Sequence, residues 1–315
     1  MTIKPPAIEA RQLSKTFGAT QVLAPLDLIV PRGSILALVG HNGAGKTTLI
    51  KLLLNILQPT TGVATVLGQS TATLTSTAFT RIGYISENQE LPDWMTVQSF
   101  LDYLRPFYPT WNETGLLDEL DLPPNRKLKH LSRGMRMKAV FASVLAFSPS
   151  VILMDEPFSG LDPVVRDELI QTLLGRIHPD DEGADESGAT ILISSHDLGE
   201  IESFATHVAF LHEGTLLFAE PMNTLITRFR EVTVTLPQSE SAEEYMTNLP
   251  DSWLSPESSG TVIRFIYTKA DTEAPEIAVR GVFQRAEGIQ SESMTLRTIF
   301  LALVKANRTE DRSRA

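Results

Sequence analysis

The sequence has 315 residues, of which 42% are hydrophobic and 21% charged, and its formal net charge is −11. The absence of cysteine excludes disulfides, thiolate zinc sites and cysteine nucleophiles, and an acidic balance without a dense basic run argues against a nucleic-acid partner. No apolar run approaches the roughly 18–20 residues that cross a bilayer, and residues 1–10 lack the apolar core of a signal peptide. We therefore expect a cytoplasmic chain, unless a partner holds it at a membrane.

Short apolar runs alternate with helical patterns along the first two thirds of the chain. Helices are predicted at Thr47–Leu57 and Val164–Ile177, and residues 208–220 predict a hairpin. The alternation favours a mostly parallel sheet with helices on both faces. Buried strands of that sheet are predicted at Ile35–Val39, Val151–Asp155 and Thr190–Ser195.

The middle and the end of the chain follow other patterns. Residues from about 88 to 150 carry helical patterns broken by prolines and no further strand before the apolar run at Val151, which predicts a helical insertion into the sheet domain. After Pro221, alternating strands and two helical patterns predict a small α+β unit. We expect a main domain at residues 1–220 and an accessory domain at 221–315.

A glycine-rich turn follows the first buried strand and opens a helix. Residues 40–47 fit the pattern G-x-x-x-x-G-K-[ST], whose glycines let backbone N–H groups turn toward phosphate oxygens at a helix N-terminus. Lys46 would reach the β- and γ-phosphates, and the Thr47 hydroxyl would bind Mg²⁺. A chance glycine turn would lack this strand–turn–helix setting. The predicted phosphate-binding residues are Gly40, Asn42, Gly43, Ala44, Gly45, Lys46, Thr47 and Thr48.

A second motif ends the strand at Val151–Asp155. Asp155 can hold Mg²⁺ and Glu156 can polarise an attacking water, although many strands end on a turn carboxylate without any such role. Together the two motifs predict a P-loop NTPase that binds ATP or a related nucleotide with Mg²⁺. A kinase or a GTPase remains open at this point.

A third motif narrows the class. Residues 131–135 read LSRGM, which resembles the LSGGQ signature of ABC ATPases, with Arg133 in place of a glycine and Met135 in place of a glutamine. Ser132 is a good helix N-cap, and a simple capped helix would look much the same. The resemblance implies that Ser132 and Gly134 approach the γ-phosphate of ATP.

Further segments resemble the same family in the same order over residues 8–220. Residues 159–162 resemble its D-loop, and His196 matches its switch histidine, which touches the γ-phosphate. Phe17 stands where the family stacks an aromatic ring on adenine, although an N-terminal Phe is more often part of a core. Glu87 stands where the family usually has glutamine, and its carboxylate could still bind Mg²⁺. The resemblance thus implies an ABC cassette with Lys46, Glu156 and His196 as catalytic residues and Thr47, Asp155 and Glu87 as metal ligands.

The kind of ABC protein follows from what the chain does and does not contain. Translation factors of the family carry two cassettes and its DNA-repair members carry long coiled coils, whereas this sequence has one cassette and no sustained heptads. The resemblance implies an ATPase subunit that pairs with a second cassette, identical or paralogous, and powers a membrane permease. Residues 87–96 would dock the permease, which would hold the chain on the inner face of the cell membrane. A soluble ABC ATPase with a regulatory or assembly role is the alternative.

The direction of transport rests on the C-terminal segment. Residues 288–304 resemble the tail of ATPases that export drugs, antibiotics and polysaccharides, although a generic helix packed on a small sheet would read similarly. The resemblance favours export over import.

Overall fold

The structure is a computed structural model that describes residues 5–177, 188–246, 249–250, 252–270 and 274–314. The chain divides into two compact units, Met1–Asp197 with Phe204–Ala219 and Leu198–Ser203 with Glu220–Ala315. In the described residues, no helix is both long and apolar enough to cross a membrane.

The larger unit is built around a six-stranded sheet with the strand order β10-β9-β3-β8-β7-β6. The pairs β3–β8, β3–β9, β7–β8 and β6–β7 are parallel, which confirms the predicted mostly parallel sheet, although β6 was not predicted as a strand. Every residue of β3, β7 and β8 is buried, as expected for strands covered on both faces. The strands span β3 (Ile35–Val39), β6 (Ile82–Ser86), β7 (Val151–Asp155), β8 (Thr190–Ser195), β9 (His207–His212) and β10 (Thr215–Pro221).

A second sheet of four strands, in the order β2-β1-β4-β5, lies in the same unit. Its pairs β1–β2, β1–β4 and β4–β5 are antiparallel. One hydrophobic core joins this sheet, helix α1 and one face of the parallel sheet. The strands are β1 (Ile8–Phe17), β2 (Thr20–Val30), β4 (Thr61–Val66) and β5 (Gln69–Ser70), and the hairpin of β1 and β2 was not predicted from the sequence.

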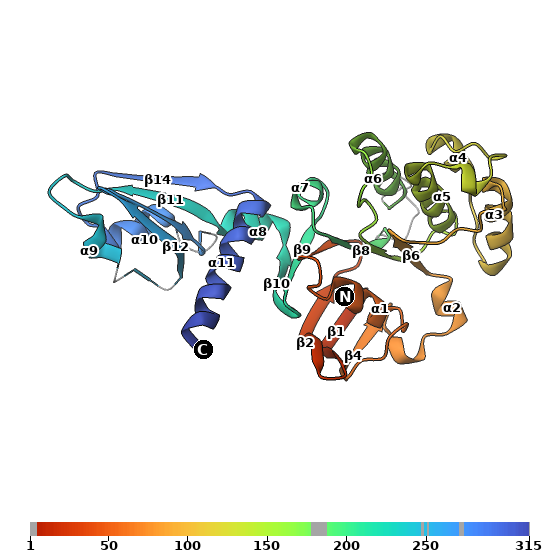
Figure 1. The fold of residues 1–315 in the computed structure, drawn as a ribbon, viewed down its shortest axis with the longest axis horizontal. Helices are drawn as coiled ribbons and strands as arrows, with labels where there is room; N and C mark the ends of the chain where they lie inside the picture. The colour runs from red at the N-terminus through yellow and green to blue at the C-terminus, as the bar shows by residue number, and fades with distance from the viewer. Residues whose placement is uncertain (1–4, 178–187, 247–248, 251, 271–273, 315) are drawn as a thin grey trace. The chain divides into compact units, whose positions relative to one another are not determined.

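Helices cover both sides of the parallel sheet, with α1 on one side and α5 and α6 on the other (Figure 1). Helix α1 ends at Leu53, earlier than predicted, because Asn55 adopts a left-handed φ of 57°. The amides of Ile56 and Leu57 then donate to the Lys51 carbonyl, as at many helix C-termini. The predicted insertion is helical. The helices are α1 (Lys46–Leu53), η1 (Thr71–Thr73), α2 (Ser76–Phe79), α3 (Val97–Leu104), η2 (Arg105–Phe107), α4 (Leu116–Glu119), η3 (Leu128–His130), α5 (Arg133–Leu145) and α6 (Pro163–Ile177).

The smaller unit has its own antiparallel sheet, in the order β12-β13-β11-β14. Its core is aromatic: the Trp253 ring stacks on Phe265 at a centroid distance of 4.2 Å and lies 6.0 Å from Phe283. The elements are α7 (Leu198–Ile201), α8 (Met222–Arg228), β11 (Arg230–Thr235), α9 (Ala242–Met246), β12 (Trp253–Ser259), β13 (Val262–Tyr267), α10 (Pro275–Val282), β14 (Gly288–Ser293) and α11 (Leu296–Arg314).

Candidate functional site

The loop between β3 and α1 has the backbone that the glycine pattern predicted. Gly43 and Gly45 have φ values of 84° and 105°, which side-chain-bearing residues rarely adopt. At Gly40, an added Cβ would lie only 2.3 Å from the Leu211 carbonyl oxygen. Gly43 is exposed, and the space where its Cβ would stand is open. The loop therefore leaves room for a ligand at the N-terminus of α1, where unpaired amides and the helix dipole favour an anion.

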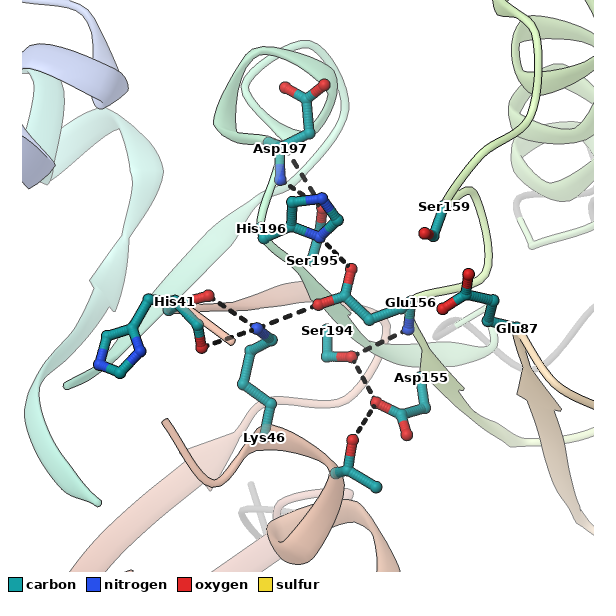
Figure 2. Close-up of polar contacts among 12 residues, drawn as sticks. His41, Lys46, Glu87, Asp155, Glu156, Ser159, Ser194, Ser195, His196 and Asp197 are labelled. Carbon is teal, nitrogen blue, oxygen red and sulfur yellow. Dashed lines mark hydrogen bonds and ion pairs between the residues drawn. The ribbon is translucent and has the colours of Figure 1, made fainter. Parts of the chain in front are cut away.

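Three of the predicted catalytic side chains meet next to this loop (Figure 2). The Glu156 carboxylate lies between a cation and an imidazole: its Oε1 is 3.0 Å from Lys46 Nζ, and its Oε2 is 2.7 Å from His196 Nδ1. Lys46 is 5% exposed and also donates to the Gly40 carbonyl at 2.7 Å. His196 is half exposed. The structure thus brings Lys46, the first residue of α1, together with Glu156 and His196, which directly follow β7 and β8.

The predicted metal ligands Thr47 and Asp155 also lie together. The Thr47 hydroxyl donates to Asp155 Oδ1 at 3.0 Å, and Ser194 donates to the same oxygen at 2.8 Å. Both hydroxyls thus bond one carboxylate oxygen, and within the described residues no protein donor bonds Oδ2. A hydroxyl and a carboxylate form an oxygen-only donor set, which suits Mg²⁺.

Ser194 is a functional residue that the sequence interpretation missed. It is fully buried on β8 and pairs in register with Asp155 on β7. Its Oγ also accepts a hydrogen bond from the Glu156 amide at 3.0 Å, so one hydroxyl orients both carboxylate residues. The available signal was a polar residue inside an otherwise apolar buried strand, since a buried hydroxyl needs a partner.

Glu156 itself has an unusual backbone. Its φ is 51°, a left-handed conformation that costs an ordinary residue roughly 1–2 kcal/mol. The hydrogen bond that the Glu156 amide donates to Ser194 Oγ helps to hold this geometry. Strain of this kind persists where the surroundings over-determine it, and it clusters at active sites.

The signature segment forms the start of α5. Ser132 caps the helix by accepting a hydrogen bond from the Met135 amide at 3.3 Å. Gly134 lies against α6, and an added Cβ there would be 3.2 Å from both methyl groups of Val165. In the described residues, no hydrogen bond joins Ser132 or Gly134 to the loop of residues 40–48 in the same chain.

The carboxylate of Glu87, the third predicted metal ligand, pairs with an arginine. Its Oε1 accepts a hydrogen bond from Arg133 Nη2 at 2.6 Å, whereas its backbone amide donates to the Asp155 carbonyl at 3.1 Å. In Figure 2 the carboxylate lies on the Ser159 side of the site, and no hydrogen bond is drawn from it to Asp155. Glu87 is thus close to the site through its backbone, while its side chain pairs with the signature helix.

Phe17 is the residue predicted to stack on adenine. Phe17 ends β1 with its ring 45% exposed, and the Lys15 ammonium lies 4.8 Å from the ring centroid. An exposed ring of this kind can stack on a planar ligand.

Burial raises the pKa of the Tyr84 phenol, the hydrogen bond with Ser86 lowers it, and the negative charge of Asp155 adds to the rise. Tyr84 is therefore a neutral neighbour of the carboxylate.

Comparison with known proteins gives this arrangement a family. The model of the ABC transporter family matches residues 23–159. The bacitracin transport ATP-binding protein BcrA of Enterococcus faecalis is 32% identical over 238 residues, which cover 74% of this chain and 75% of that relative. The chain belongs to the ATP-binding proteins of ABC transporters.

Two further comparisons agree with the ABC assignment. The lantibiotic transport ATP-binding protein SrtF of Streptococcus pyogenes is 29% identical over 218 residues, covering 67% of this chain and 89% of that protein. A solved ATP-binding subunit of an ABC transporter superposes with a TM-score of 0.63 and 27% identity over 70% of this chain and 91% of that one. This ABC protein is therefore an ATP-binding cassette ATPase whose hydrolysis is coupled to transport, as the sequence resemblance implied.

Proposed function

We propose that this ABC ATPase works as one of two cassettes that close head to tail over ATP and drive a separate membrane permease for export. The observation that carries the proposal is the joined set of Lys46, Glu156 and His196, linked through Ser194 to Asp155. Each of these side chains has a partner that fixes its direction. Such preorganised charges are what phosphoryl transfer to water requires.

The roles of the residues follow from their positions. Lys46 and the amides of residues 40–48 would bind the phosphates, and Phe17 would stack on adenine. The Glu156 carboxylate would orient and deprotonate the attacking water, while His196 would contact the γ-phosphate. When ATP binds, the ion pair between Lys46 and Glu156 would open. Lys46 would then contact the phosphate oxygens, and the Glu156 carboxylate would bind the attacking water.

Mg²⁺ fits the oxygen pair of Thr47 and Asp155. When bound by Thr47 and Asp155, the ion would supply positive charge that neutralises phosphate charge. Glu87 was predicted as a third ligand, and its carboxylate would have to leave Arg133 to serve in that way.

The second cassette would supply the missing half of each site. Ser132 and Gly134 at the start of the 13-residue helix α5 would meet ATP bound on residues 40–48 of the partner cassette, which could be identical or paralogous. Opening and closing of this pair would move the permease. We propose that residues 1–220 form the cassette, including a helical subdomain at about 88–150, and that residues 221–315 form an accessory domain.

The permease would dock on residues 87–96, where Trp94 is 72% exposed. It would hold the ABC ATPase on the inner face of the cell membrane. Export is supported by relatives whose names refer to bacitracin and lantibiotic transport.

The catalytic roles are tested by Glu156→Gln and Lys46→Ala. Loss of the general base should lower kcat about 10²–10⁴-fold, while ATP still binds. Loss of the Lys46 ammonium should weaken ATP binding about 10–100-fold, the equivalent of one charge-assisted hydrogen bond of about 1.5–3 kcal/mol. Turnover and nucleotide affinity are measured separately on the purified protein. Normal turnover in E156Q would remove Glu156 from its role, and unchanged affinity in K46A would refute the phosphate assignment.

The transport role is tested by purifying the chain from native membranes in mild detergent and identifying what accompanies it. A polytopic membrane protein is the expected partner. Soluble partners alone, with the chain absent from the membrane fraction, would overturn the permease assignment and leave a soluble regulatory ATPase.

A further inference from the structure

Arg133 reaches from the signature helix to two other segments of the site. It is the residue that replaces a glycine of the family pattern. Its Nη2 donates to Glu87 Oε1 at 2.6 Å and to the Ser159 carbonyl at 2.7 Å. A single nitrogen therefore links the start of α5, the segment after β6 and the loop after β7.

The guanidinium also lies flat against the loop after β7. An added Cβ at Gly160 would be 2.8 Å from Arg133 Nη1 and 2.9 Å from Cζ, so the absence of a side chain at Gly160 lets the guanidinium approach. Gly160 has a φ of 64°. The next residues begin α6, where Asp162 Oδ1 accepts from the amides of Val164 and Val165 at 3.1 Å.

This loop leads directly from the proposed general base. The Ser159 amide donates to the Glu156 carbonyl at 3.2 Å, so the residue that Arg133 bonds is one turn from Glu156. On the other side, the Glu87 amide bonds the Asp155 carbonyl at 3.1 Å. Arg133 thus closes a ring of contacts around residues 155–160, the segment that carries both carboxylates.

We propose that Arg133 is a positioning residue for ATP hydrolysis, which holds the loop at Ser159 and Gly160 in place and is itself fixed by Glu87. The proposal rests on the proposed function of Glu156. It assigns the Glu87 carboxylate to Arg133 and not to the metal. Two of the departures from the family pattern, Arg133 and Glu87, then form one unit, in which an added cation on α5 pairs with an added anion after β6.

The ion pair is too exposed to act mainly through stability. The side chains of Arg133 and Glu87 are 55% and 30% exposed, and pairs at such exposure contribute little to the free energy of unfolding. Its effect should therefore be local, on the geometry of Glu156. Misplacing a catalytic group by about 1 Å would lower kcat while leaving the phosphate contacts of residues 40–48 unchanged.

The same helix offers a matched control. Arg136 Nη1 also bonds one carboxylate, Asp93 Oδ1 at 2.8 Å, and one carbonyl, that of Leu128 at 3.0 Å. Those partners are outside the ring around residues 155–160. The variants Arg133→Ala and Arg136→Ala therefore remove the same kinds of bond from the same helix.

The first experiment compares ATP hydrolysis by full-length wild type, R133A, R133K, R136A and E156Q. R133A should lower kcat about tenfold or more with less than a threefold change in KM for ATP. R133K should recover part of the loss, because an ammonium keeps the charge without the planar fork. R136A should stay within about twofold of wild type in kcat, and R133A and R136A should shift Tm equally little. A kcat for R133A equal to that of R136A would overturn the proposal.

The second experiment separates Glu87 as a partner of Arg133 from Glu87 as a metal ligand. The hydrolysis rate is titrated with Mg²⁺ for Glu87→Gln, R133A and the double variant. If Glu87 acts through Arg133, E87Q lowers kcat in the wild-type background, has no further effect in R133A, and leaves the half-saturating Mg²⁺ concentration unchanged. A Mg²⁺ requirement raised by E87Q in both backgrounds would overturn the pairing. A wild type no faster than E156Q would instead refute the proposed function, and this proposal with it.

Discussion

Removing the Ser194 hydroxyl tests whether one buried group organises both carboxylate residues. In Ser194→Ala, Asp155 Oδ1 loses a donor at 2.8 Å and the Glu156 amide loses an acceptor at 3.0 Å. Ser194 is fully buried and its strand is covered on both faces, so replacement donors from solvent are not at hand. The substitution changes the side-chain volume little, which makes the lost hydrogen bonds the main effect.

The magnitude follows from the two bonds. A hydrogen bond to a charged group contributes about 1.5–3 kcal/mol, and a backbone amide left without an acceptor costs about 1–3 kcal/mol. The expected loss is thus about 2.5–6 kcal/mol in the free energy of unfolding of the larger unit. For a unit of about 150–250 residues, each kcal/mol lowers Tm by roughly 2–4 °C, so we expect a fall of roughly 5–24 °C. Because Asp155 loses its orienting partner, the Mg²⁺ affinity should also fall by about 10–100-fold.

Calorimetry and a Mg²⁺ titration of ATP hydrolysis measure the two effects. Ser143→Ala is the matched control: Ser143 is 5% exposed, and its hydroxyl bonds the Val140 carbonyl within its own helix at 2.7 Å. Its loss leaves no buried amide unpaired and should cost about 1 kcal/mol or less. Equal Tm losses in the two variants, or an unchanged Mg²⁺ requirement in S194A, would refute the role of Ser194.

Two further predictions concern stability. Trp253→Ala should destabilise the smaller unit by about 3–5 kcal/mol, because the ring is 6% exposed and stacked at 4.2 Å on Phe265. Ile277→Ala, at a 71% exposed site, is the control and should change the free energy of unfolding by about 0.5 kcal/mol or less. Equal calorimetric shifts in the two variants would contradict the stacked core. Burial lowers the pKa of His207 from 6.5, so the folded state binds this proton less readily than the unfolded state does. The stability that comes from keeping His207 neutral is therefore present above pH 6.5 and is lost as the pH falls through the lowered pKa. His207→Gln should therefore flatten the decline of Tm between about pH 7 and 5, and an unaltered decline would show that other groups cause it.

The parallel sheet and its loops could be predicted because their signals are local. Three apolar runs fix the buried strands, and the carboxyl ends of neighbouring parallel strands must meet at one edge of the sheet. That rule brings Glu156 and His196, which follow β7 and β8, to the loop after β3 that leads to Lys46, and the structure has the three side chains in contact. The glycine conformations at residues 43 and 45 were likewise implied by their own positions in the loop.

Other elements could not be predicted because tertiary packing overrides their local pattern. Strand β1 has register shifts between Ala10 and Thr16, and Gln12 has a φ of 46°, so the alternation expected of a strand is interrupted. Helix α1 was predicted to reach Leu57, which does pack against the core, but the chain reaches that position after leaving the helix. At Leu57 the apolar pattern therefore predicts burial correctly and the backbone conformation incorrectly.

The ion pair of Arg133 with Glu87 could not be predicted from a single sequence. The two residues are 46 positions apart, and each looks alone like a departure that weakens a family motif. Their charges are opposite, yet opposite charges are common, and only the fold shows that both stand beside residues 155–160. Once they are seen as partners, the altered signature and the altered Glu87 position become one change, and the relevant question is how the pair acts on Glu156. The positive φ of Glu156 makes that question sharp, because a strained residue keeps its geometry only while the neighbouring contacts hold it.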